Sequence, residues 1–147
     1  MAALLRYCEQ FAKQMLSDAG EFHPFGAFIN SSGELEALGG YLGTEFPSGG
    51  ELYTLLEGAL ASMVHERKAR AYALAANVNM PAQVSSIFTD GVRVHIEAPG
   101  YSRLVYTPYR LLSYRAIRKF LAVVPTVEYA EPIAVDVPNK VFAAAEG

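Results

Sequence analysis

The spacing of hydrophobic residues changes twice in the first third of the chain. Apolar side chains recur every three or four positions over residues 2–19, which predicts an amphipathic helix that ends before Gly20. Apolar residues then occupy alternate positions on both sides of the turn-forming Ser-Ser-Gly at 31–33. We therefore expect a β-hairpin with strands over 23–30 and 33–42.

The same order returns in the middle of the chain. Leucines every three or four positions predict a second helix over 49–68, and Gly58 inside it predicts close packing against a sheet. Residues 71–80 alternate, with alanines on one face where another element can approach closely. A second hairpin is predicted over 92–97 and 101–107, with one face of its first strand buried and one in water.

The pattern after Thr107 is less decisive. Thr107-Pro108 is typical of a helix start, so residues 108–124 are either a helix or a loop. Residues 126–135 predict a final edge strand, in which Pro132 is tolerated at an edge or a bulge.

These elements predict an α+β fold in a single domain over 1–147. We expect an antiparallel sheet of five to six strands with two amphipathic helices packed on it. Both helices are expected to cover the side of the sheet that carries Val92, Val94 and Ile96.

Composition favours a partner for this fold. Hydrophobic residues make up 52% of the chain and charged residues only 18%, which leaves apolar surface for a protein partner or a homodimer. We see no apolar segment with the length of a signal peptide or a membrane span, and the single cysteine, Cys8, cannot form an internal disulfide. We therefore expect a cytoplasmic protein without a membrane contact.

Charge is distributed unevenly. Residues 1–60 contain eight acidic and two basic side chains, whereas residues 93–119 contain six basic and one acidic. The basic part interleaves arginine with tyrosine, a combination found in protein interfaces and in sites for anions or single-stranded nucleic acid. A protein interface ranks first, a solvated face second and nucleic acid third, because the net charge is −3. The candidate binding residues of this run are Arg103, Tyr106, Tyr109, Arg110 and Tyr114.

Histidines are the other candidates. His95 alternates with Arg93 and Glu97 on the strand face expected to be in water. We expect a surface charge ladder with cross-strand partners such as Arg103, with a general base made of His95 and Glu97 as the alternative. His23 precedes a proline, which favours a role in shaping the start of a strand over a catalytic role.

Other chemistries lack their motifs. The spacing of histidines and the single cysteine predict no metal site, and no cofactor is expected because the glycine pairs match neither a P-loop nor a dinucleotide fingerprint. Gly49-Gly50 opens the second helix, where an anion would be held only weakly.

Three segments carry a resemblance. "FHPFGAFIN" at the first hairpin, "PYR" after the second and "VEYAEPIAV…VFA" near the end resemble a family of small uncharacterised bacterial proteins. The resemblance implies a bacterial origin and assigns no catalytic residue. At the level of the fold, the element order is similar to profilin-like and roadblock-like modules, which implies binding rather than catalysis.

Three functions follow in order of preference. The first is a non-enzymatic module that self-associates or docks a protein. The second is a small-molecule or anion-binding domain that uses Tyr106, Tyr109 and Arg110. The third is an enzyme that uses His95 with Glu97, or His23.

Overall fold

Two α-helices and seven strands make up the described part of the chain, which the computed structural model covers at residues 2–39, 49–84, 87–112 and 126–142. Their order agrees with the alternation of helical and strand periods in the sequence. The elements are α1 (Ala2–Ala19), β1 (Phe25–Asn30), β2 (Leu35–Leu38), α2 (Gly49–His65), β3 (Ala69–Asn79), a short 3₁₀ turn (Ala82–Val84), β4 (Asp90–Ala98), β5 (Tyr101–Leu112), β6 (Thr126–Tyr129) and β7 (Ile133–Asp136).

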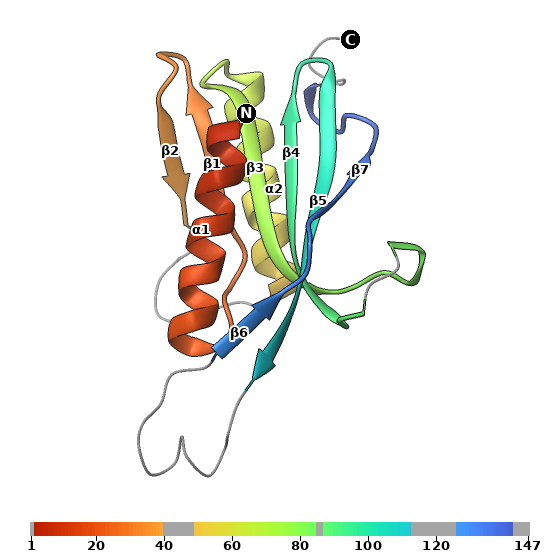
Figure 1. Cartoon of the computed structure of the whole chain (residues 1–147). Coiled ribbons are helices and arrows are strands. Elements are labelled where there is room, and N and C mark those ends of the chain that lie inside the picture. Colours follow the sequence, from red (N-terminus) through yellow and green to blue (C-terminus); the bar gives the residue numbers. More distant parts are fainter. Residues whose placement is uncertain (1, 40–48, 85–86, 113–125, 143–147) are drawn as a thin grey trace.

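The strands form one antiparallel, curled sheet (Figure 1). Its order is β2-β1-β3-β4-β5-β6, and β7 also pairs with β5. Since β4 occupies one edge of β5, β6 and β7 share the other, where β6 pairs with 109–112 and β7 with 103–106. The α+β prediction is confirmed, with one strand more than expected. Residues 126–135 contain two strands instead of one, and Pro132 lies between them because it has no N–H to donate to a ladder.

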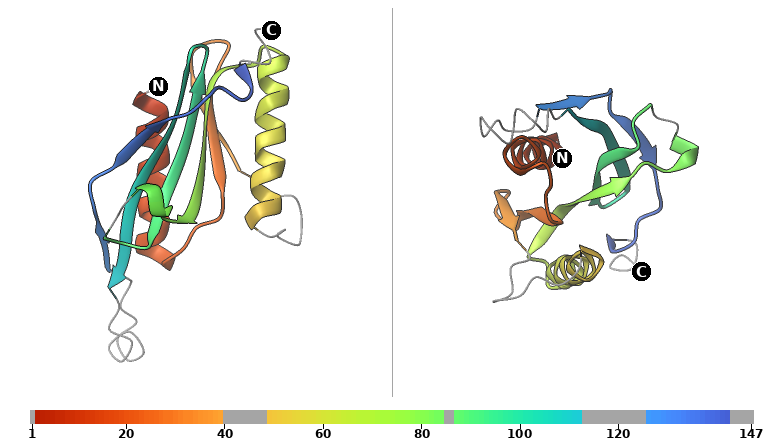
Figure 2. Two further views of the ribbon diagram at one scale, coloured as in Figure 1. Left: turned by 90° about the vertical axis from the view of Figure 1, so that its right-hand side faces the viewer. Right: turned by 90° about the horizontal axis from the view of Figure 1, so that it is seen from below.

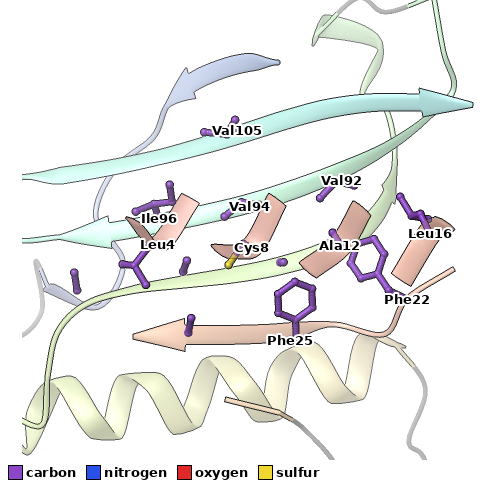
Figure 3. Packing of buried hydrophobic residues seen from close by; sticks show 14 of the residues in the cluster. Leu4, Cys8, Ala12, Leu16, Phe22, Phe25, Val92, Val94, Ile96 and Val105 are labelled. Carbon is purple, nitrogen blue, oxygen red and sulfur yellow. The ribbon is translucent and has the colours of Figure 1, made fainter. Parts of the chain in front are cut away.

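The first helix packs on one face of the sheet. Leu4, Cys8, Ala12 and Leu16 are fully buried along a single stripe of α1. They meet alanines 71, 73 and 75 of β3 and the alternating apolar residues of β4, including Val94 (Figure 3). Small side chains on both the helix and the strand allow the close approach that the alternation predicted.

The second helix covers the opposite face, so the prediction that both helices share one side is wrong (Figures 1 and 2). The buried stripe of α2, at residues 52, 56, 60 and 64, contacts Phe28, Tyr72 and Leu74. Tyr72 and Leu74 point away from the alanines of β3, because neighbouring residues of a strand face opposite ways. The second apolar face of β3 is therefore buried by α2.

The close approach of α2 to the sheet does not occur at Gly58. A Cβ atom added to Gly58 would meet nothing within 4 Å among the described residues, which contradicts the predicted packing role. The close approach is at Gly26 in β1, where a Cβ would lie 3.2 Å from the carbonyl oxygen of Ala73 and 3.4 Å from Cδ1 of Leu60. A small residue is therefore needed on the strand, not on the helix.

The helix or loop expected from residue 108 onward is wrong for residues 108–112, which continue β5, and 113–124 lie outside the described residues. The carbonyl oxygen of Pro108 accepts from the N–H of Ala130, so this residue faces the edge shared by β6 and β7. The missing donor of Pro108 thus lies where the partner of β5 changes from β7 to β6, and no ladder bond is lost.

The end of α2 differs slightly from the prediction. It stops at His65, three residues early, where Arg67 adopts a left-handed φ of 61° and the N–H of Lys68 donates to the carbonyl of Met63. Neither this helix nor α1 has the length and apolar character that a membrane span requires, and they are the only α-helices within the described residues.

Candidate functional site

Three ionisable residues form a row along β4 on the face that α2 covers. Arg93, His95 and Glu97 stand at alternate positions, and His95 and Glu97 lie opposite Leu74 and Tyr72 of β3. His95 is 4% exposed and Glu97 is fully buried, so the predicted surface charge ladder is wrong. The polar side of β4 is enclosed at His95 and Glu97, whereas Arg93 is partly exposed.

Glu97 is enclosed by residues 137–142, which we call the C-terminal segment. Its Oε1 accepts the backbone N–H groups of residues 140, 141 and 142 at 2.9, 2.7 and 2.9 Å. Its Oε2 accepts the hydroxyl of Tyr72 at 2.8 Å. The carboxylate therefore anchors the end of the described chain to the centre of the sheet.

These hydrogen bonds decide the ionisation of Glu97. Burial raises the pKa of the carboxyl group, but the backbone donors of 140–142 and the Tyr72 hydroxyl outweigh burial and lower its pKa below the ordinary value. Burial and the neighbouring carboxylate raise the pKa of Tyr72, which keeps the phenol as the donor. Glu97 is thus an ionised structural anchor and a poor proton acceptor.

His95 lies beside Glu97. Its Nε2 is 3.1 Å from Oγ of Ser102 and 3.4 Å from Oε2 of Glu97. Burial lowers the pKa of the imidazole more than the Glu97 carboxylate raises it, so the ring is neutral at pH 7. A buried neutral imidazole among hydrogen-bonding groups is consistent with a lining role.

A serine, a histidine and a glutamate at these distances have the composition of a nucleophilic triad. In a triad the imidazole bridges the other two groups through its two different nitrogens. Here both Ser102 and Glu97 contact the same Nε2 atom of His95. The arrangement therefore cannot relay a proton across the ring from serine to carboxylate.

Two cavities open on this face beside α2, and together they form what we call the α2 groove. The first has a volume of about 500 Å³ and the second about 430 Å³. Tyr53 of α2 and Arg93 of β4 belong to the walls of both. The first cavity is also lined by Phe22, His23, Pro24, Gly49, Gly50, Ala76 and Asn77, and the second by His95, Leu104, Val137, Pro138, Asn139 and Lys140.

Arg93 is the unusual member of this groove. Its guanidinium lies over the ring of Tyr53, with 5.2 Å between Cζ and the ring centroid. Its Nε atom is buried and has no hydrogen-bond partner among the described residues. Since buried donors are nearly always paired in folded proteins, this N–H is a candidate contact for an acceptor from outside the described residues.

The structure divides the sequence-predicted residues between several places. His95 and Tyr106 share the α2 face, and Tyr106 is buried opposite Arg93. His23 lines the first cavity, so it stands at the same groove as His95. Tyr109 is buried against α1 on the other face, with its hydroxyl donating to Asn77 Oδ1 at 2.6 Å.

The two arginines of the candidate run lie on β5 and pair with residues of the edge strands β6 and β7. Arg103 pairs with Asp136 and Arg110 with Glu128, each at 2.7 Å across neighbouring strands. Both are cross-strand ion pairs with acids near the C-terminus. Tyr114 lies outside the described residues. The Tyr/Arg run as a whole therefore forms no common surface in the described part.

Arg93 and Tyr53 are the groove residues that sequence reasoning missed as candidates. A signal was present: β3 has an apolar residue at nearly every position of both faces, which implies cover on both sides of the sheet. A polar row on the adjacent β4 would then be enclosed. Tyr53, which follows a buried leucine of α2, had no comparable signal.

Other chemistry is not assembled in the part of the chain that the structure describes. No three histidine, cysteine, aspartate or glutamate side chains converge there as metal ligands would. Cys8 is fully buried, and burial raises its thiol pKa to about 12, in agreement with the inert role expected from its place on the helix stripe.

Comparison with known proteins adds no relative. No family model, curated protein or solved structure matches the chain. The resemblance to small bacterial proteins and the likeness to profilin-like and roadblock-like modules therefore stay predictions.

Proposed function

We propose that this protein binds a small anionic molecule in the α2 groove, with Arg93 as the principal contact. The observation that supports the proposal most directly is that Arg93 lines both cavities while its buried Nε–H has no hydrogen-bond partner among the described residues. A guanidinium group keeps its positive charge and presents donors in a fork that matches an anion.

Three features support Arg93 as a binding group and not a structural one. Its guanidinium is stacked on Tyr53, which orients the charged group without occupying its donors. No carboxylate among the described residues forms an ion pair with it, although Arg103 and Arg110 each have one. The two cavities also have volumes within the range of about 300–1,000 Å³ typical of small-molecule sites.

A thermal-shift panel of phosphate and simple carboxylates tests this function with Arg93→Gln and the matched control Arg103→Gln, since Arg103 lies on the other face. At ten times the dissociation constant, a bound anion should raise the melting temperature of the wild type by roughly 3–5 °C. The Arg103→Gln control should keep that increase and Arg93→Gln should lose it. Equal responses of the two variants, or no response of the wild type, would refute the proposal.

The other sequence-based functions are less well supported. Self-association or docking of a protein stays a prediction from composition and charge. An enzyme that uses His95 with Glu97 is disfavoured by the occupied lone pairs of Glu97, whose Oε1 already accepts three backbone donors.

A further inference from the structure

The two cavities of the α2 groove differ in the polar groups that remain unpaired. In the second cavity, Nδ2 of Asn139 donates to the carbonyl oxygens of Ala98 and Tyr101 at 2.9 and 3.1 Å. The ammonium group of Lys140 donates to the carboxylate of Glu57 at 3.0 Å. These polar side chains already form hydrogen bonds within the protein, so they contribute little to the binding of a ligand.

The surface that the second cavity presents to a ligand is mainly apolar. Leu104 of β5 and the neighbouring Val137 and Pro138 supply apolar surface, and Tyr53 supplies the wall shared with the first cavity. Nε2 of His95, also in this lining, is already next to Ser102 Oγ at 3.1 Å. Arg93, whose Nε–H has no hydrogen-bond partner among the described residues, lines both this cavity and the first. The groove therefore combines one cationic point with an adjoining apolar wall.

The charged groups around Arg93 limit the kind of anion that can bind there. Arg93 is a single cation, and Lys140 is already neutralised by its contact with Glu57. The buried carboxylate of Glu97 lies two residues from His95 on the same strand face. A dianionic phosphate would need further positive charge, whereas one carboxylate matches the guanidinium fork.

Resting on the anion site proposed above, we propose that the ligand of the α2 groove is an amphipathic monocarboxylate. Its carboxylate pairs with Arg93, and its hydrocarbon part lies in the second cavity against Leu104, Val137 and Pro138. Medium-chain fatty acids have this chemistry, and their unbranched series provides probes that differ only in apolar length.

The experiment is an NMR titration that follows the side-chain Nε–H resonance of Arg93. The probes are sodium propanoate, hexanoate, octanoate and decanoate, with octanol as the uncharged probe and inorganic phosphate as the purely anionic one. Each methylene buried in the cavity should tighten binding roughly fourfold. Affinity should therefore rise steeply from propanoate to octanoate, while octanol binds at least tenfold more weakly than octanoate.

One variant and its matched control test the contribution of the hydrocarbon part of the ligand to binding. Leu104→Gln keeps the approximate size of the side chain but makes the second cavity polar, so it should flatten the dependence on chain length and leave propanoate binding unchanged. Leu55→Gln is the matched control, because Leu55 of α2 is 46% exposed and belongs to neither cavity lining. This control should retain the full dependence.

The outcomes distinguish the two proposals. Propanoate and phosphate shifting the Arg93 resonance without any gain from longer chains would overturn the amphipathic ligand and leave the anion site standing. Chain-length dependence that persists unchanged in Leu104→Gln, or octanol binding as tightly as octanoate, would also overturn it. No shift with any anion would overturn both proposals.

Discussion

Glu97 shows how hydrogen bonds keep a negative charge in the interior of this protein, since no lysine or arginine among the described residues forms an ion pair with it. The three backbone N–H groups of 140–142 and the hydroxyl of Tyr72 surround the carboxylate at 2.7–2.9 Å. Hydrogen bonds to an ionised acceptor are worth more than those between neutral groups, which offsets the cost of burial. This side chain holds the C-terminal segment in place together with the hydrogen bonds of Asn139 and Lys140.

Replacing Glu97 with glutamine should therefore be costly despite the similar shape of the two side chains. The substituted amide would retain one oxygen for the backbone donors but lose the charge, and its NH₂ group would face the Tyr72 hydroxyl. We expect Glu97→Gln to lower the free energy of unfolding by about 2–4 kcal/mol, measured by urea denaturation.

Glu128→Gln is the control for loss of a carboxylate, because Glu128 pairs with Arg110 at an exposed edge. It should cost less than about 1 kcal/mol. If both substitutions cost the same, the anchoring role of Glu97 is wrong.

The sequence marks the position of Glu97 but not its partners. Alternation along β4 places residues 93, 95 and 97 on one face, and this part of the prediction holds. The donors that enclose Glu97 come from residues 43 to 45 positions later. Local periodicity contains no information about contacts at that separation. The alternating pattern around a buried Glu97 is therefore the same as around an exposed one.

At the scale of elements, prediction succeeded where one pattern dominates. The stripe of α1 and the two-residue period of β3 are long and regular, and both elements form where expected. The sequence predicts too short a β5, because Thr107-Pro108 is typical of a helix start. A proline is compatible with a strand where no acceptor on the neighbouring strand needs its N–H. At Pro108 this position is the break between β6 and β7, which comes from a distant part of the chain.

Gly58 gives a test at the level of a helix. It lies on the exposed side of α2, where an added methyl group meets nothing within 4 Å among the described residues. Alanine has the higher helix propensity, so Gly58→Ala should raise the free energy of unfolding by about 0.5–1 kcal/mol.

The matched substitution Gly26→Ala should destabilise, since its methyl group would press on the carbonyl oxygen of Ala73. Thermal denaturation of the two variants compares these effects. Destabilisation by Gly58→Ala would restore the close-packing role that the sequence suggested.

The whole molecule is a curled sheet with one helix on each face (Figure 2). Sequence reasoning placed both helices on one side because it treated the polar row of β4 as solvent-exposed. The apolar residues on both faces of β3, Ala73 on one and Leu74 on the other, carry the correct information. The groove exists because α2 covers β1 and β3 more fully than β4 and β5.

Stability of the whole protein should fall on mild acidification. The pKa of His95 is lower in the folded protein than its unfolded value of about 6.5, so the unfolded chain binds the proton more readily below that pH. Its contribution is constant above about pH 7, and stability falls by up to about 1.4 kcal/mol per pH unit below pH 6.5. The lowered pKa of Glu97 adds a further loss at more acidic pH.

Urea denaturation between pH 5 and 8 checks this dependence. His95→Gln should reduce the decline below pH 6.5, whereas the control His23→Gln, at an exposed position, should leave the His95 contribution in place. A His95→Gln variant with an unchanged pH profile would contradict the prediction.

The long separation between Glu97 and its donors also affects synthesis. While the ribosome is still translating the residues after β5, the carboxylate on β4 lacks its three backbone donors and depends on water for solvation. The face of the sheet beneath α2 can become dry only after Phe142 has left the exit tunnel. We therefore expect folding of this face during translation to lag behind that of the α1 face, whose helix is made first.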